Sequence, residues 1–341
     1  MRRLPIYFLV DVSESMAGVP IEEVQKGMKN IVQDLRTNPY ALETVHIGII
    51  AFAGKAKILS PLTEIFKFYP PVFPLGGGTS LGAGLNMLMD DIDKSVVKTT
   101  VEQKGDWKPI VFLFTDGTPT DNPDMAINRW NSKFRKRANI IAISIGNNAN
   151  TQLLGKISDN VLRLNDTDEH SFQQFFKWIT ASVSTASFSV GEQGDDSVHL
   201  APTGGINLEK VDTSQPCNVD DNFVVIRGKC SETKKQYLLK YAKEFGDYFK
   251  QQFKIVGSYA IDGESYEALS DGKSKNSFNV NQLEGFPSCP CCGNRWAFIV
   301  CECGNVFCAG DKPVCKCPWC GMEGEISAVG SEGINVNRGQ G

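Results

Sequence analysis

The strongest constraint on the fold is a repeated alternation, over the first 187 residues, of short apolar runs and longer amphipathic segments. Runs such as IVFLFT and IIAISI are almost entirely apolar, which indicates strands buried on both faces of a sheet. We expect strands at Ile6–Val10, Val45–Phe52, Lys57–Leu62, Ile110–Thr115, Ile140–Ile145 and Val161–Leu164. Helices are expected between them at Ile21–Leu35, Ser80–Ile92, Pro123–Lys136 and Glu169–Ser184. This order predicts an α/β fold with a doubly wound, mainly parallel sheet.

The length of 341 residues exceeds the roughly 100–200 residues of a typical single domain, so we expect two domains. The first occupies residues 1–187, and residues 188–218, rich in Gly, Asp, Ser, Pro and Thr, are expected to form a linker. Residues 219–325 contain β-branched and aromatic runs at 223–228, 236–243 and 253–261, which predict a small β-rich domain. Residues 326–341 are rich in Gly and Asn and predict a flexible tail.

Polar side chains directly follow the first expected strand. In the phrase DVSES, Asp11, Ser13 and Ser15 lie at the carboxyl end of that strand, where open α/β sheets place their ligands. Because the oxygen-bearing residues alternate along the chain, three donors can converge from one loop. The same motif alone is also typical of turns and helix caps.

Two later phrases supply further oxygen atoms. Thr79 follows three glycines in LGGGTSLG, and these glycines permit backbone conformations that bring its hydroxyl close to a neighbouring loop. Asp116 follows another buried strand in FLFTDG. The order of the three phrases within one α/β pattern predicts a single site at the ends of the strands.

The predicted site contains two carboxylates and three hydroxyls, an all-oxygen set suited to Mg²⁺ or Mn²⁺. Mg²⁺ prefers six ligands and keeps water molecules readily, so the site leaves a position for an incoming group. We expect a partner protein to supply an acidic residue there, which makes its binding dependent on the metal.

Nine of the 11 cysteines fall between Cys289 and Cys320, in C-x-C and C-x2-C spacings that suit thiolate metal sites in a reducing compartment. CPCCG at 289–293 and CPWCG at 317–321 resemble the knuckles of zinc ribbons. Pairing the knuckles gives a first four-thiolate zinc site of Cys289, Cys292, Cys317 and Cys320. A second site is then available from Cys301, Cys303, Cys308 and Cys315.

The sequence leaves the pairing of these cysteines open, so one or two zinc ions are expected. Cys291 is left over by this division, and Cys217 and Cys230 are expected to be ordinary thiols. An iron–sulfur cluster is the chemical alternative, but the knuckles differ from ferredoxin spacing.

Residues 4–187 resemble the von Willebrand factor A superfamily, whose metal ion-dependent adhesion site uses this set of ligands. Asp11, Ser13, Ser15, Thr79 and Asp116 all match it, and Glu14 departs from the glycine found in many members. The glutamate either tunes the charge of the site or faces solvent. The phrases GGTSLG and TDGTPTD are most similar to TerY-type proteins of bacterial tellurite-resistance and stress-response gene clusters.

The resemblance extends to residues 219–325, since TerY-type proteins carry a C-terminal cysteine-rich metal-binding domain. It implies a phosphorylation signalling module, with a protein kinase and a metal-dependent serine/threonine phosphatase as partners. We therefore expect a non-enzymatic scaffold or adaptor that binds proteins through its metal site.

Two other functions compete with this interpretation. A Mg²⁺-dependent phosphotransferase is disfavoured because haloacid-type enzymes need a carboxylate two residues after the first Asp, where this chain has Ser13. A zinc-ribbon subunit of a nucleic-acid complex is the other class, since lysines and aromatic residues alternate along residues 223–260. A solvated face over an aromatic core explains those residues as well, so nucleic acid is not an expected partner.

The overall charge and hydropathy exclude two kinds of association. The formal net charge of −4 provides no general attraction to nucleic acid or anionic lipid. The N-terminal apolar run from Leu4 to Val10 ends at Asp11 without a cleavage site for a signal peptide, and no run approaches the roughly 20 apolar residues that cross a bilayer. A cytoplasmic protein without a membrane partner is expected.

Overall fold

The structure is a computed structural model that describes residues 2–146, 149–166, 168–192, 200–203, 208–213, 222–244, 252–272, 277–311, 313–326 and 333–339. The chain divides into two compact units. The first comprises Met1–Val12, Val19–Phe73 and Thr79–Val219, and the second comprises Ser13–Gly18, Pro74–Gly78 and Asp220–Gly341. Two short segments from the N-terminal half therefore group with the cysteine-rich unit.

The first unit is built around a seven-stranded sheet in its described part, with strand order β3-β2-β1-β4-β5-β6-β7. The strands are β1 (Leu4–Asp11), β2 (Val45–Phe52), β3 (Ala56–Glu64), β4 (Ile110–Thr115), β5 (Asn139–Ile145), β6 (Asn160–Leu164) and β7 (Leu208–Lys210). The five central strands are parallel, and β3 and β7 are antiparallel edges. The predicted α/β class with a mainly parallel sheet is confirmed.

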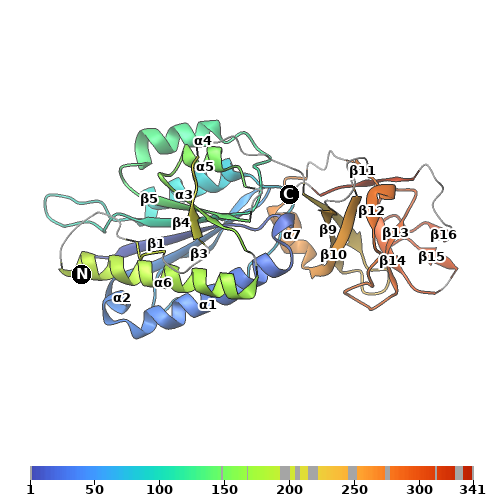
Figure 1. The fold of residues 1–341 in the computed structure, drawn as a ribbon, viewed down its shortest axis with the longest axis horizontal. Helices are drawn as coiled ribbons and strands as arrows, with labels where there is room; N and C mark the ends of the chain where they lie inside the picture. Colours follow the sequence, from blue (N-terminus) through green and yellow to red (C-terminus); the bar gives the residue numbers. More distant parts are fainter. Residues whose placement is uncertain are drawn as a thin grey trace. The chain divides into compact units, whose positions relative to one another are not determined.

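Helices cover both faces of this sheet. They are α1 (Val19–Thr37), α2 (Pro39–Thr44), α3 (Leu81–Ser95), α4 (Asp124–Arg129), α5 (Thr151–Gly155) and α6 (Glu169–Glu192). Helices α1, α2 and α6 lie on one face and α3, α4 and α5 on the other (Figure 1).

Successive residues of the central strands pack into opposite layers, which explains why the strands are apolar throughout. Tyr7 and Leu9 belong to the cluster that includes α3 and α4. Phe8, between them, stacks on Phe112, with ring centroids 5.6 Å apart. Burial of one such side chain contributes about 1.5–3 kcal/mol, so both faces of the sheet stabilise the fold.

The first unit differs from the sequence-based expectation at short elements. Helix α2 begins where Asn38 accepts hydrogen bonds from the backbone N–H groups of Tyr40 and Ala41, and α5 begins at a similar asparagine cap, Asn150. Each is too short to show helical periodicity.

The predicted linker at 188–218 is also partly wrong, because α6 extends to Glu192 and β7 joins the sheet.

The second unit contains a six-stranded sheet in its described part, with order β12-β10-β9-β8-β14-β13. Its elements are β8 (Phe223–Lys229), β9 (Gln236–Glu244), β10 (Gln252–Ile261), α7 (Gly263–Leu269), β11 (Ser277–Asn279), β12 (Leu283–Glu284), β13 (Trp296–Val300), β14 (Val306–Ala309), β15 (Val314–Lys316), β16 (Glu323–Glu325) and β17 (Asn335–Asn337). Strand β11 pairs with β17, and β15 pairs with β16. The β-rich class of this unit is confirmed.

The predicted flexible tail is wrong for the residues that the structure describes. Strand β17 pairs antiparallel with β11, and Val336 is buried in the core of the second unit. A single apolar residue between asparagines carries no periodic signal, so the sequence did not indicate this strand.

No described helix is long and apolar enough to cross a membrane.

Candidate metal centres

Two carboxylates lie at the carboxyl edge of the sheet in the first unit. Asp11 is the last residue of β1, and Asp116 follows β4 directly. The two strands are parallel neighbours, with Val10 opposite Phe114, so both side chains belong to the same edge. Both are buried, and Asp11 accepts a hydrogen bond of 2.7 Å from the hydroxyl of Thr115.

Thr79 is tied to the loop that follows β4. Its backbone N–H donates to Oγ1 of Thr120 at 2.9 Å, and its carbonyl accepts from the N–H of Thr120 at 2.8 Å. The next turn is held in the same way, because the N–H of Gly82 donates to Oδ2 of Asp121 at 2.9 Å. Thr79 is buried, and its two hydrogen bonds with Thr120 hold it to the loop that follows β4.

Ser13 and Ser15 lie in the segment Ser13–Gly18, which groups with the second unit. Their hydroxyl oxygens are 3.0 Å apart and both residues are buried. Ser13 also forms a parallel bridge with Gly76, in the glycine-rich segment before Thr79. The phrases DVSES and LGGGTS are therefore joined by backbone pairing, as the prediction requires of neighbouring loops.

The donors at these positions fit a hard cation. Buried carboxylate and hydroxyl oxygens are the ligands that Mg²⁺ and Mn²⁺ prefer, and a cation offsets the cost of burying two acidic groups. The five-residue cation site itself stays a prediction.

Glu14 is fully buried, which excludes the interpretation that it faces solvent. The hydroxyl of Tyr266 donates a hydrogen bond to its Oε1. Burial raises the pKa of Tyr266, and the charge of Glu14 raises it further, so the phenol keeps its proton. The glutamate that replaces the common glycine thus has a defined partner within the second unit.

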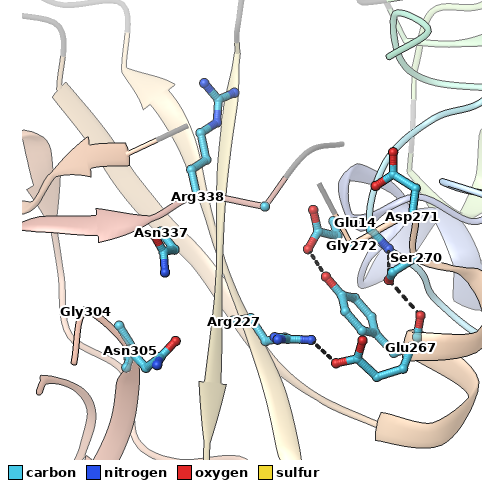
Figure 2. Close-up of a pocket in the computed structure, with 14 residues that line it drawn as sticks. Glu14, Arg227, Glu267, Ser270, Asp271, Gly272, Gly304, Asn305, Asn337 and Arg338 are labelled. Atoms are coloured by element: carbon cyan, nitrogen blue, oxygen red, sulfur yellow. Dashed lines mark hydrogen bonds and ion pairs between the residues drawn. The ribbon is translucent and has the colours of Figure 1, made fainter. Parts of the chain in front are cut away.

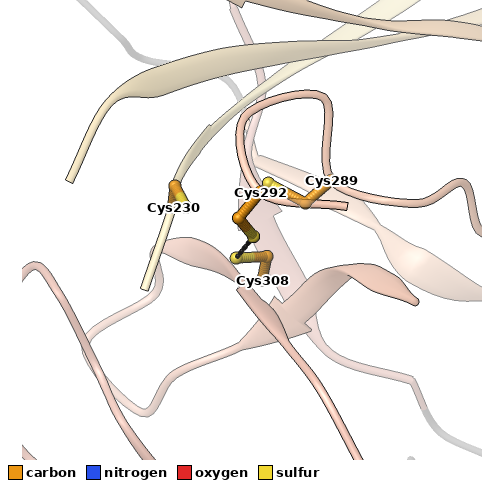
Figure 3. A group of neighbouring side chains, drawn as sticks. All are labelled: Cys230, Cys289, Cys292 and Cys308. Carbon is orange, nitrogen blue, oxygen red and sulfur yellow. Dashed lines mark hydrogen bonds between the residues drawn. The ribbon is translucent and has the colours of Figure 1, made fainter. Parts of the chain in front are cut away.

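The described cysteines form two groups of four, and neither group is the one predicted. The first consists of Cys230, Cys289, Cys292 and Cys308 (Figure 3). The second consists of Cys301, Cys303, Cys317 and Cys320. In each group all four sulfur atoms lie within 4.8 Å of one another.

The spacing of the sulfur atoms fits a tetrahedral metal. A zinc–sulfur bond of about 2.3 Å places ligand sulfurs about 3.8 Å apart. The sulfur atoms lie 3.7 Å apart in Cys292 and Cys308, 3.6 Å apart in Cys301 and Cys320, and 3.9 Å apart in Cys303 and Cys317. These distances exclude disulfide bonds, whose sulfurs lie about 2.05 Å apart.

The hairpin of β13 and β14 explains why the predicted pairing is wrong. Cys301 and Cys303 lie at its turn, which closes where the N–H of Cys301 donates to the carbonyl of Asn305. Cys308 lies farther along β14, toward the end of the hairpin where Trp296 pairs with Ala309. Cys301 and Cys303 therefore lie at one end of the hairpin and Cys308 lies toward the other, although the three are close in sequence.

Cys230 was predicted to be an ordinary thiol, and this was wrong. It follows β8, which pairs in parallel with β14 so that Lys229 lies opposite Phe307. This pairing places Cys230 beside Cys308. An isolated cysteine 59 residues before Cys289 has no spacing motif, and only strand pairing could have revealed it.

Two other cysteines belong to neither tetrad. Cys315 was predicted as a ligand but lies on β15, outside both groups. Cys291 lies outside both as well, as expected, with its sulfur 3.8 Å from the carbonyl of Gln236. Cys217 lies outside the described residues.

Each tetrad contains one thiol that ionises easily. Burial acts to raise the pKa of Cys230, but hydrogen bonds from Thr233 outweigh it and lower the pKa from 9.0 to about 6. Burial likewise opposes ionisation of Cys303, but hydrogen bonds from Asn305 lower its pKa to about 7. Burial raises the pKa of Cys289 and Cys301, so a full set of thiolates requires a bound cation.

Two of the aromatic side chains considered for stacking on nucleic-acid bases are buried in the second unit. Tyr237 and Tyr241 are fully buried, and the hydroxyl of Tyr237 donates to the carbonyl of Ala297. Lys240, from the same strand, is also buried. The alternation of basic and aromatic residues along β9 therefore reflects the interior of the second unit.

Two family models match the chain. The model described as von Willebrand factor type A domain matches residues 6–178, slightly more than half of the chain. The chain belongs to the von Willebrand factor type A family. In this family member, the second model, described as TerY-C metal binding domain, matches residues 220–341 and spans both cysteine tetrads. The recognised combination of a von Willebrand factor A domain and a TerY-C domain is confirmed.

Curated relatives match only part of this von Willebrand factor A protein. Inter-alpha-trypsin inhibitor heavy chain H1 from Bos taurus is 25% identical over 119 residues, which are 34% of this chain and 13% of the relative. The same protein from Sus scrofa is 24% identical over 119 residues, with the same coverage of 34% and 13%. The chain thus spans about an eighth of the length of these relatives.

Two solved structures are similar to this chain over part of its length. The ArnB paralog VWA2 from Sulfolobus acidocaldarius has a TM-score of 0.40 at 14% identity, covering 77% of this chain and 66% of that one. Proximal thread matrix protein 1 from the mussel byssus, solved with a zinc occupied MIDAS motif, has a TM-score of 0.38 at 19% identity, covering 55% and 46%.

Proposed function

We propose that this protein is a non-enzymatic scaffold that binds a partner protein through Mg²⁺ or Mn²⁺. The cation would be held by the predicted set of Asp11, Ser13, Ser15, Thr79 and Asp116. The observation that supports this most is the burial of two carboxylates at the carboxyl edge of one sheet, with Ser13 and Ser15 following Asp11 along the chain. When bound, the cation supplies an open coordination position for an acidic side chain of the partner.

The cysteine tetrads would hold zinc with a structural role. Four thiolates fill a tetrahedral zinc completely, so no position remains for a substrate. Zinc there would stabilise the cysteine-bearing part of the second unit, where β13 to β16 are only three to five residues long, and would keep its surface available for a further partner. A cytoplasmic location suits eight reduced thiols.

The absence of catalytic function is part of this proposal. Ser13 stands where haloacid-type phosphotransferases have a second carboxylate. The ring of His46 makes a local contact, because its Nδ1 lies 3.1 Å from the carbonyl oxygen of Thr44, two residues earlier in the chain. Measurable turnover of phosphoesters by the purified protein would contradict this part.

The biological setting that we propose follows the TerY-C match. The family's name suggests a tellurite-resistance or stress-response module, in which a protein kinase and a metal-dependent serine/threonine phosphatase would be the partners. The scaffold would bring these enzymes together, one at the cation site and the other on the second unit.

The test is binding of each candidate partner to wild type, Thr79→Ala and Asp116→Ala, with Mg²⁺ and with chelator. Chelation and either substitution should weaken the complex about a hundredfold, because a charge-assisted contact to a cation contributes several kcal/mol. Replacing one acidic residue of the partner by its amide should have the same effect. Equal affinity under all conditions would show that the partner uses another surface.

A further inference from the structure

The first cysteine tetrad is part of the hydrophobic core of the second unit. Its members are buried in that core or pack against it: Cys230, Cys289, Cys292 and Cys308. Backbone N–H groups also contact its sulfur atoms. Ser231 donates to Sγ of Cys308 at 3.2 Å, and Thr233 donates to Sγ of Cys230 at 3.3 Å. Protein atoms therefore surround the place where these four thiols meet.

The second tetrad lies at the surface of the same unit. Cys303 and Cys320 are exposed and Cys301 is half-buried, whereas Cys317 is buried. These cysteines come from two short pieces of chain, the turn of the β13–β14 hairpin and the loop between β15 and β16. Strands β15 and β16 form a two-stranded sheet separate from the six-stranded one. A molecule in solution can therefore approach two of the four cysteines directly.

Access to the ligands governs how fast a bound metal is exchanged. Chelators and competing metal ions remove a thiolate-bound metal one bond at a time, so they must first reach a ligand sulfur. The protein shell around a metal site controls this access. The rate of exchange is separate from the affinity, because four thiolates hold zinc tightly in either tetrad. The open tetrad can thus bind its metal tightly and still exchange it quickly.

A tryptophan connects the second tetrad to the six-stranded sheet. Trp319 directly precedes Cys320, and its Nε1–H donates to the carbonyl of Val306 on β14 at 2.8 Å. Two cations of β8 lie over the indole ring, with Cζ of Arg227 at 5.2 Å and Nζ of Lys229 at 5.1 Å from its centroid. A metal that fixes Cys320 therefore also holds the adjacent indole against the sheet.

The second tetrad also borders a pocket of the second unit. Arg227 lines this pocket, and its guanidinium pairs with Glu267 (Figure 2). Gly304 and Asn305 line it as well, and both belong to the turn that carries Cys303. Nδ2 of Asn305 donates to Sγ of Cys303 at 3.4 Å. One wall of the pocket is thus built on a ligand of the second tetrad.

We propose that the second tetrad is an exchangeable metal site, which takes up and releases zinc or another thiophilic cation such as Cd²⁺, whereas the first tetrad keeps its metal. Loss of metal from the second tetrad releases Trp319 from the sheet and loosens one wall of the pocket. The second unit thereby responds to the supply of metal. This inference rests on the proposed function, because it divides between the tetrads the metal-binding role proposed for both.

The experiment follows the exchange of radioactive zinc into the full-length, zinc-loaded protein. Labelled zinc is added in excess, with Mg²⁺ present to occupy the proposed oxygen-ligand site, and bound label is counted after rapid desalting. We expect one zinc ion per chain to exchange about ten to a hundred times faster than the other, the range over which the surroundings of a metal site alter its binding. A single common rate overturns the proposal.

Substitution assigns the fast-exchanging ion to a tetrad. Cys303→Ser with Cys320→Ser should remove the fast ion and leave the slow one, because both residues belong to the second tetrad. Both positions are exposed, so the core of the unit should keep its fold. Loss of the slow ion with fast exchange retained overturns the assignment. Cys291→Ser with Cys315→Ser, a matched pair outside both tetrads, should keep both rates.

Trp319→Phe tests the connection between the metal and the sheet. When a chelator removes metal from the wild type, the tryptophan fluorescence should change at the rate of the fast ion, and Trp319→Phe should lose this change. Its fast ion should also exchange faster, because the indole no longer holds the knuckle to Val306. Trp296→Phe, at an exposed tryptophan of β13, is the control and should keep the change. A fluorescence change of wild-type size in Trp319→Phe overturns the connection.

Metal content separates failure of this inference from failure of the proposed function. If the purified wild type lacks zinc at the cysteines, and a thiol reagent modifies all of them at once, the tetrads were wrongly assigned as metal sites. Two zinc ions that exchange at one rate leave the tetrads as metal sites and overturn only the difference between them.

Discussion

The division of the cysteines into two tetrads gives the sharpest prediction, because a single substitution tests a ligand that no spacing motif reveals. If the first tetrad holds zinc as we propose, Cys230→Ser removes one of its four zinc–sulfur bonds. Structural zinc sites have apparent binding free energies of about 10–16 kcal/mol, so one ligand accounts for about 2.5–4 kcal/mol. We therefore expect the zinc affinity of that site to fall roughly a hundredfold to a thousandfold.

Double substitutions test the same assignment by the number of zinc ions that stay tightly bound. Cys230→Ser with Cys289→Ser damages one tetrad and should leave one tightly bound zinc. Cys289→Ser with Cys317→Ser damages both and should leave none. If the two knuckles formed one site, as the sequence suggested, this second pair would leave one zinc.

The assay is competition with a chromophoric chelator of known zinc affinity, with elemental analysis of the protein after dialysis. Cys291→Ser with Cys315→Ser is the control, since neither residue belongs to a tetrad, and it should keep two tight zinc ions. One retained zinc in Cys289→Ser with Cys317→Ser, or a lost zinc in the control, would refute the assignment.

Three further predictions concern the cation site, the second unit and pH. By calorimetry, Asp11→Ala should reduce Mg²⁺ affinity more than Thr79→Ala, because it removes a charge; undiminished affinity would contradict the site. In urea unfolding, Val336→Ala should destabilise the second unit by about 1–3 kcal/mol, whereas Ile334→Ala, at an exposed position, should change little. Burial lowers the pKa of His46 below 6.5, so the unfolded chain takes up this proton first and the free energy of unfolding should fall as the pH drops below 6.5. His46→Gln should remove that part of the pH dependence, and an unchanged slope would exclude His46 as its source.

The sequence was most informative for strands that are buried on both faces of the sheet, because such strands appear as nearly continuous apolar runs. The expected strands Val45–Phe52 and Ile110–Thr115 coincide with β2 and β4, and the polar residues after such strands could be placed at one edge of the sheet. The parallel register of β1 and β4 then bears out the shared edge of Asp11 and Asp116. Short elements that depend on one cap or one buried side chain, such as α2 and β17, carried no comparable pattern.

The cysteine-rich unit shows the opposite case. Spacing identified a thiolate metal domain, because knuckles are local in sequence. The partition into tetrads depends on the β13–β14 hairpin and on the pairing of β8 with β14, which are contacts between distant residues. The partner of Glu14 was hidden for the same reason, since Tyr266 lies 252 residues away.

The interleaved order of the two tetrads has a consequence for biosynthesis. As the chain leaves the ribosome, Cys289, Cys292, Cys301 and Cys303 emerge before Cys308, so the first four clustered tetrad cysteines to appear are a mixture of both final sites. A zinc ion captured at that moment would lock the wrong set. Closure of the β13–β14 hairpin separates these thiols, and it becomes possible only once residue 309 has been synthesised. We therefore expect the yield of correctly metallated protein to depend on whether the metal arrives before or after that hairpin closes.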